Sequence, residues 1–368
     1  MKAPVVSSRT SRLSEWTRFP SGVSRLCVSG TTDAARALYL TALLRERRRA
    51  GVGCGIVAVT PTGDAALRLY EDLRFFQDRA GPPVLIFPSW DLAPLEPLSP
   101  SPKTVGARLT TLSAWSEGEP CLTVTSLSAL AQKLIPPQAI LSAALDLERG
   151  FPLDRDELLE DLLRAGYHRS PVVEDEGEYA VRGSLVDVFS PQSEFPVRIE
   201  FDEDGIFSLR RFQVGDQRSV ERLERVQIMP AREIILDEEA RTRATGKLQD
   251  WAGSGGSDER DRFELLADRL LEDGHFPGLE TLAPLFRDDL IAAVEALPPD
   301  ALVALSEPDA MPEADEARWE RLSEAADAGR AGAAPFPLED FSLPPGAVLD
   351  ALTARAAPDS PVIDLPSL

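Results

Sequence analysis

Apolar runs alternate with helical stretches through the first third of the chain, and this alternation limits the fold more than any other feature. Each apolar run is short enough for a strand, and the stretches between them have the period of a helix. Parallel strands need such crossover helices. The sequence therefore predicts an α/β domain with a parallel sheet. The predicted strands are residues 25–30, 55–60, 83–87 and 121–125, and the predicted helices are residues 33–50, 62–78, 104–115 and 126–133.

The turn between the first strand and the first helix stands where a nucleotide-binding domain holds phosphate. Such a loop needs a second glycine, a lysine for the phosphates and a hydroxyl for magnesium. Ala35, Arg36 and Ala37 occupy those three positions, and Asp33 adds a negative charge where phosphate would lie. We therefore expect a degenerate loop that binds no nucleotide and hydrolyses no ATP.

No other group of residues has the composition of an active site. The chain has 2 histidines and 3 cysteines, which are scattered and too few for a metal cluster or a disulfide framework. Its serines have no histidine partner at a recognisable spacing, and its paired carboxylates lie in polar loops. We expect no catalytic, cofactor-binding or metal-binding residue, and no cofactor.

Charge and hydropathy argue against two classes of function. The chain carries 39 Lys and Arg against 61 Asp and Glu, a net charge of −22. Non-specific binding to nucleic acid needs a basic surface, so this balance opposes it. The N-terminus has no signal-peptide pattern, and no apolar run reaches about 18 residues. We expect a soluble, cytoplasmic protein with no membrane partner.

A different pattern, of short runs with a period of two, begins near residue 176. Residues 180–189 predict one strand, residues 197–201 a second, and residues 206–212 a third. Asp204-Gly205 between the last two is a hairpin signal. The pattern predicts a small antiparallel sheet with one polar face. Its basic side chains are Arg182, Arg198, Arg210 and Arg211.

Arg182 and Gly183 are the most informative pair in this region. Glycine permits close approach of another backbone, which favours a role in binding a partner. Alternatively, Arg182 pairs with Glu178 or Glu200 across the sheet, and such an ion pair at a surface contributes little to stability. The residue pattern leaves both interpretations open.

The rest of the chain predicts further helices and two late strands. Residues 232–275 are polar and helical in pattern, with a flexible loop expected at 252–257. Residues 301–305 and 361–365 predict strands, and an acidic helix is expected at 313–328.

Several motifs, taken together and in order, resemble a known family. Residues 176–189 read Glu-Gly-Glu-Tyr-Ala-Val-Arg-Gly-Ser-Leu-Val-Asp-Val-Phe, and residues 195–201 read Phe-Pro-Val-Arg-Ile-Glu-Phe. Gly166-Tyr167 precedes them, and Gln217-Arg218-Ser219 follows. This order and spacing resemble the N-terminal, UvrB-like region of the bacterial transcription-repair coupling factors, the Mfd family. The resemblance covers residues 20–345.

The resemblance implies both a fold and a function. The fold would be a degenerate helicase-like, P-loop NTPase-type domain, into which a small antiparallel α+β domain and a further subdomain are inserted. The chain would be a non-catalytic module that recruits the nucleotide excision repair protein UvrA to stalled transcription. Full-length family members are ATP-dependent DNA translocases, and they contact RNA polymerase and DNA through other domains. The residues that the motif carries over as partner-binding are Arg182, Arg169, Gly183, Tyr179, Val188 and Phe189.

The same resemblance suggests domain limits and leaves two other functions open. One alternative is a structural or autoinhibitory module that restrains a translocase motor, and the other is a fragment of a UvrB-type DNA helicase. The expected divisions are a lead-in at 1–20, the UvrB-like domain at 21–139 and 300–345, the UvrA-binding-like sheet domain at 140–231, an inserted helical subdomain at 232–299 and a C-terminal segment at 346–368.

Overall fold

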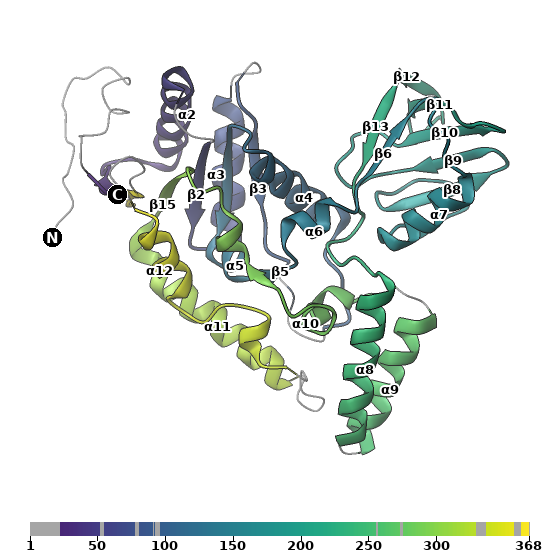
Figure 1. Cartoon of the computed structure of the whole chain (residues 1–368). Helices are drawn as coiled ribbons and strands as arrows, with labels where there is room; N and C mark the ends of the chain where they lie inside the picture. The colour runs from purple at the N-terminus through teal and green to yellow at the C-terminus, as the bar shows by residue number, and fades with distance from the viewer. Residues whose placement is uncertain are drawn as a thin grey trace.

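A six-stranded sheet forms the core of the first domain (Figure 1). The computed structural model describes residues 23–367 except 52–54, 78–80, 91, 93–95, 255–256, 273–274, 329–335 and 357–361, so the expected lead-in lies outside the described residues. The strands are β1 (Arg25–Cys27), β2 (Gly55–Thr60), β3 (Val84–Phe87), β4 (Cys121–Ser126), β15 (Leu302–Ser306) and β16 (Val362–Leu365). Their order is β1-β16-β15-β2-β4-β3, and every neighbouring pair is parallel. The predicted α/β class is confirmed.

Helices cover both faces of this sheet. Leu40 of α2 (Asp33–Ala50) and Leu73 of α3 (Gly63–Phe76) belong to the apolar cluster on one face. Leu109 of α4 (Pro102–Glu117) and Leu130 of α5 (Leu127–Ala131) belong to the cluster on the other. Figure 1 shows α11 (Met311–Ala328) and α12 (Ala347–Ala354) on that second side as well. Because both faces are covered, β2 and β4 are buried along their whole length, which explains their continuous apolar runs.

Local signals set the ends of these helices. The Ser101 hydroxyl accepts a hydrogen bond from the Thr104 backbone N–H at 3.1 Å, and Pro102 follows in the first turn, so α4 begins there. The helix ends at Gly118, whose φ of 68° is readily adopted by glycine. Sequence prediction placed the ends of α2, α3, α4 and α5 within two residues of where the structure has them.

The second sheet is built from a segment that interrupts the first. The chain leaves the parallel sheet after β4 and returns to it only at β15. In between lie β7 (His168–Arg169), β8 (Glu178–Arg182), β9 (Leu185–Val188), β10 (Val197–Asp202), β11 (Gly205–Phe212) and β12 (Ser219–Leu223). They form one sheet in the order β12-β11-β10-β9-β8-β7, in which only β7 and β8 are parallel.

The prediction of a single strand over residues 180–189 is wrong. The segment forms β8 and β9, which pair antiparallel with Arg182 opposite Leu185. Gly183 makes the reversal possible, because its φ of 62° lies in the left-handed region that favours glycine. The sequence carries a signal for this turn, because Gly183-Ser184 is a pair typical of a two-residue hairpin loop.

One face of this sheet packs on α7 (Arg155–Arg164) and on the pair formed by β6 (Leu145–Glu148) and β13 (Arg225–Ile228). Leu158 and Leu162 of the helix are fully buried against Val186 and Ile199 of the strands. The opposite face of the sheet carries charged side chains beside a small apolar cluster of Val173, Ala180 and Phe189. We call the whole unit, from β6 to β13, the sheet domain.

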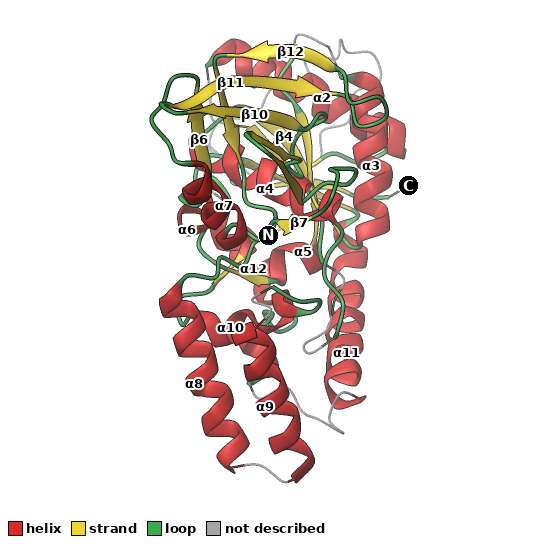
Figure 2. Cartoon of the chain, turned by 90° about the vertical axis from the view of Figure 1, so that its right-hand side faces the viewer, coloured by secondary structure: helices red, strands yellow, loops and turns green. Residues whose placement is uncertain are grey.

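A helical hairpin extends away from both sheets (Figure 2). Its helices are α8 (Glu238–Ser254) and α9 (Ser257–Glu272). Part of the loop predicted at 252–257 is helical, since α8 continues to Ser254 and α9 begins at Ser257, and residues 255–256 lie outside the described residues. Within the described residues, no helix is long and apolar enough to cross a membrane. The remaining short elements are β5 (Lys133–Leu134), α6 (Pro137–Leu141), η1 (Leu279–Leu282), α10 (Ala283–Phe286), β14 (Ile291–Ala292), η2 (Ala293–Ala296), η3 (Pro308–Ala310) and η5 (Leu338–Asp340).

Candidate interaction surface on the antiparallel sheet

Charged side chains line up across the polar face of the sheet domain. The strand register places Asp187 of β9, Arg198 of β10, Arg210 of β11 and Arg222 of β12 in one row. Arg182 of β8 lies next to this row, because it is bonded to Asp187. We call this surface, which also includes Glu200, the arginine face. Four guanidinium groups against two carboxylates give it a local excess of positive charge on a chain whose net charge is −22.

Asp187 organises the arginine face. Its side chain is 1% exposed, and it receives hydrogen bonds from two arginines. Arg182 Nη2 lies 2.5 Å from Oδ2, while Arg198 donates from Nε to Oδ1 at 2.7 Å and from Nη2 to Oδ2 at 2.9 Å. A buried carboxylate is stable only when it is paired, and the two-point contact with Arg198 supplies that pairing. The ion pair expected between Arg182 and Glu178 or Glu200 is not the one found, since Arg182 pairs with Asp187.

The two arginines of this cluster differ in solvent exposure and in the number of contacts that hold them. The side chain of Arg198 is 19% exposed, and its guanidinium group stacks over the Phe212 ring, 4.4 Å from the centroid. Its hydrogen bond with Asp187 raises the pKa of Arg198 above the ordinary value, although burial opposes this effect. The side chain of Arg182 is 43% exposed and is held by fewer contacts. Arg182 therefore remains accessible to a second molecule, whereas Arg198 is mostly buried and holds Asp187 in place.

A glutamine from the neighbouring loop completes the cluster. Gln217 Oε1 accepts from Arg198 Nη2 at 3.0 Å and lies 3.4 Å from Arg182 Nη2. Its amide nitrogen donates to the Val214 carbonyl at 3.0 Å. The loop between β11 and β12 thus touches both arginines.

The residues that the family motif singled out divide into two groups. Arg169 is exposed on the edge strand β7, and Arg182 and Gly183 are exposed at the β8–β9 turn. The side chains of the other three point into apolar clusters: Tyr179 and Val188 lie in the core of the sheet domain, and Phe189 packs with Val173 and Ala180. Two of the six, Arg169 and Arg182, therefore present an accessible side chain that can make polar contacts.

Sequence reasoning missed Asp187, Gln217 and Arg222. A carboxylate between the apolar residues Val186 and Val188 was a usable signal, because a strand pattern places it opposite a partner on a paired strand. Gln217 belongs to the Gln217-Arg218-Ser219 motif of the family resemblance, but its left-handed backbone and its contacts with the two arginines are not visible in the sequence.

Internal contacts occupy the turn that the sequence predicts to be a degenerate phosphate loop. Arg36, at the position where such a loop would have its lysine, is buried and lies 3.1 Å from both Asp33 and Glu307. The cation at the start of α2 is thus already paired with two carboxylates. Among the described residues, no group of three or more His, Cys, Asp or Glu side chains is placed to hold a metal ion.

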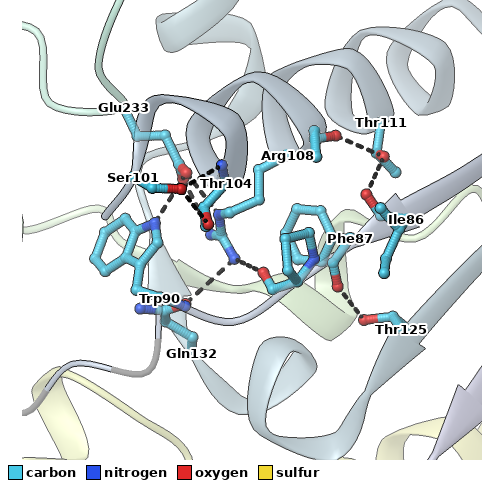
Figure 3. Close-up of polar contacts among 12 residues, drawn as sticks. Ile86, Phe87, Trp90, Ser101, Thr104, Arg108, Thr111, Thr125, Gln132 and Glu233 are labelled. Atoms are coloured by element: carbon cyan, nitrogen blue, oxygen red, sulfur yellow. Dashed lines mark hydrogen bonds and ion pairs between the residues drawn. The ribbon is translucent and has the colours of Figure 1, made fainter. Parts of the chain in front are cut away.

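The segment that follows the last strand of the sheet domain is bound to the α/β domain by buried polar contacts (Figure 3). Arg108 of α4 is fully buried, with Nε 2.5 Å from Glu233 Oε1 and Nη2 3.0 Å from Oε2. Trp90 Nε1 donates to the same carboxylate at 2.9 Å, and Gln132 Oε1 accepts from Arg108 Nη1 at 3.2 Å. The segment after β13 therefore cannot move without breaking a buried ion pair.

The sheet domain lies within a segment that matches a known class of module. Residues 145–234 match the model of a family described as the UvrB interaction domain. The chain as a whole is similar to proteins named transcription-repair-coupling factor. It is 36% identical to that of Myxococcus xanthus over 81% of the chain and 25% of the relative. It is 33% identical to that of Escherichia coli over 57% of the chain and 18% of the relative. It is 30% identical to that of Bacillus subtilis over 62% of the chain and 19% of the relative.

These matches confirm the resemblance. The chain resembles a UvrB-like module of a transcription-repair coupling factor, with a UvrB interaction domain inserted in an α/β domain. It spans a quarter or less of the length of these three relatives.

Proposed function

We propose that the chain is a cytoplasmic, non-catalytic module that binds UvrA through the arginine face and so recruits nucleotide excision repair to stalled transcription. The observation that carries this proposal is the exposed guanidinium group of Arg182, held over the buried Asp187 within the segment that matches the UvrB interaction domain. Arginine suits such a surface, because its planar group can form two hydrogen bonds with one carboxylate.

The degenerate phosphate loop supports the non-catalytic part of the proposal. Phosphate would have to displace Asp33 and Glu307 from Arg36, and both carboxylates would then repel it. The purified chain should therefore show no ATPase activity above a blank. Sustained ATP turnover that copurifies with the chain would contradict this part and favour the helicase alternative.

Binding of UvrA is tested by titration calorimetry with purified UvrA. Arg182→Ala should weaken the complex at least tenfold, or about 1.4 kcal/mol, because it removes the accessible cation. The fold should survive, since Arg198 still neutralises Asp187. Arg211→Ala is the matched control, an exposed arginine of the same sheet that pairs with Glu221 instead. A folded wild-type chain that does not bind UvrA would disprove the proposal.

A further inference from the structure

Gln217 has an unusual backbone conformation for its residue type. Its φ is 59°, and Glu307 is the only other non-glycine residue with positive φ in the described part of the chain. Glycine adopts this conformation freely, whereas a residue with a Cβ is strained in it. Strain of this kind persists where the surrounding structure holds it in place, and it is found most often at functional sites.

The loop around Gln217 is well ordered by its own hydrogen bonds. Gln213 N–H donates to the Arg218 carbonyl, and Gln217 N–H donates to the Gln213 carbonyl, both at 2.9 Å. The backbone would accept glycine at position 217 in place of glutamine. Any advantage of glutamine therefore comes from its side chain.

That side chain joins the two arginines of the cluster. Its Oε1 is the only acceptor besides Asp187 that contacts both Arg182 and Arg198 within the described residues. Because its Nε2 is tied to the Val214 carbonyl, the oxygen is directed toward the guanidinium groups. An amide oxygen accepts hydrogen bonds from two cations without neutralising their charge. A second carboxylate would neutralise one of the two. The two arginines and Asp187 keep one net positive charge.

We propose that Gln217 is a positioning residue that holds Arg182 and Arg198 side by side, as a preformed site for one carboxylate of the partner protein. The proposal rests on the function proposed above and adds a partner chemistry, an Asp or Glu side chain, and a residue that prepares the site. Arg182 has N–H donors for which the described residues supply no acceptor, so a carboxylate can add to the cluster. Holding two long side chains in place before binding reduces the entropy lost on binding.

The first test separates positioning from stability. Gln217→Gly removes the amide and also relieves the backbone strain, so the variant should fold with a melting temperature close to that of the wild type. Its affinity for UvrA should nevertheless fall at least tenfold. The matched control is Gln213→Gly, in the same loop, whose exposed side chain makes no hydrogen bond within the described residues. Unchanged affinity in Gln217→Gly would overturn the proposal, and so would an equal loss in the control.

The second test measures how firmly the two arginine side chains are held in the free chain, without UvrA. The Nε–H signals of Arg182 and Arg198, observed by NMR, should be separate and slowly exchanging in the wild type. In Gln217→Gly the Arg182 signal should move toward the position and exchange rate of a solvent-exposed arginine. Gln217→Glu should keep the wild-type signals but still bind UvrA less tightly, because it cancels the net charge. Identical Arg182 signals in the wild type and Gln217→Gly would show that Gln217 holds nothing.

The two measurements separate this inference from the proposed function. If the wild type does not bind UvrA, the function fails and the carboxylate site fails with it, whatever the NMR signals show. If the wild type binds UvrA, and the Gln217 variants have the same affinity and the same arginine signals as the wild type, UvrA binding stands and the role of Gln217 is refuted.

Discussion

His275 lies where the helical hairpin, the sheet domain and the segment between them meet. Burial is the largest cause, and together with the nearby cations Arg232 and Arg241 it lowers the pKa of His275 from 6.5 to about 3, against a smaller opposing effect of the Arg164 backbone. The imidazole is therefore neutral in the folded chain over most of the acid range. A neutral histidine at this position avoids adding a third positive charge to a buried junction.

Stability should fall on acidification because of this histidine. Below pH 6.5 the unfolded chain binds a proton at His275 that the folded chain does not bind, so unfolding becomes easier until the pH reaches about 3. From pH 7.5 to pH 5 the loss is about 2 kcal/mol, at ~1.4 kcal/mol per pH unit. His275→Gln should lack this part of the decline in urea unfolding. The exposed His168→Gln is the control and should keep it. Parallel profiles for His275→Gln and the wild type would contradict the assignment.

At the scale of single elements, α4 has to fit closely against the sheet domain. Gly106 lies inside this helix, and a Cβ there would overlap the backbone carbonyl of Pro191, in the loop between β9 and β10. A glycine inside a helix ordinarily costs about 1 kcal/mol relative to alanine. Its presence here is explained by the close approach of two backbones.

Gly106→Ala should therefore destabilise the chain, against the normal helix preference. Overlap with a backbone atom forces a shift that typically costs about 1–3 kcal/mol. Gly246→Ala in α8 is the matched control, because nothing lies within 4 Å of its added Cβ. That variant should gain up to about 1 kcal/mol in urea unfolding. Equal gains in both variants would show that Gly106 is not in a tight contact.

Elements with long, regular patterns were predictable from the sequence, and short ones were not. The strands β2 and β4 are continuous apolar runs and the helices α2 and α4 span 18 and 16 residues, so composition and spacing sufficed. The division of 180–189 into two strands comes at Gly183-Ser184, a short turn inside an otherwise strand-like run, and strands such as β6 and β13 exist because they pair with each other. For the arginine face, the sequence predicted the basic residues of β8, β10 and β11. Their arrangement around Asp187 and Gln217 required strand register and loop conformation.

At the scale of the whole molecule, two buried carboxylates join the three parts. Glu233 binds Arg108 of the α/β domain directly after the sheet domain ends. Glu280 binds Arg232 at 2.6 Å and accepts a hydrogen bond from Ser99 at the same distance. These contacts connect the segment after the hairpin to the segment before it and to the α/β domain. The parts are connected by paired charges as well as by apolar contact, so we expect them to unfold together. A surface on the sheet domain is then held in a fixed orientation relative to the parallel sheet.

This coupling predicts a strong asymmetry between single and double variants of the Arg108–Glu233 pair. Glu233→Gln leaves the fully buried Arg108 without its counter-charge and should cost about 3–5 kcal/mol. The double variant Arg108→Met with Glu233→Leu removes both charges and should recover most of that loss, since apolar replacements of a buried pair are often nearly neutral. Urea unfolding provides both values, with the number of transitions as a second result. One transition in the wild type and two in Glu233→Gln would show that this pair couples the domains. A cost below about 1 kcal/mol for Glu233→Gln, the value typical of a surface pair, would show that it does not.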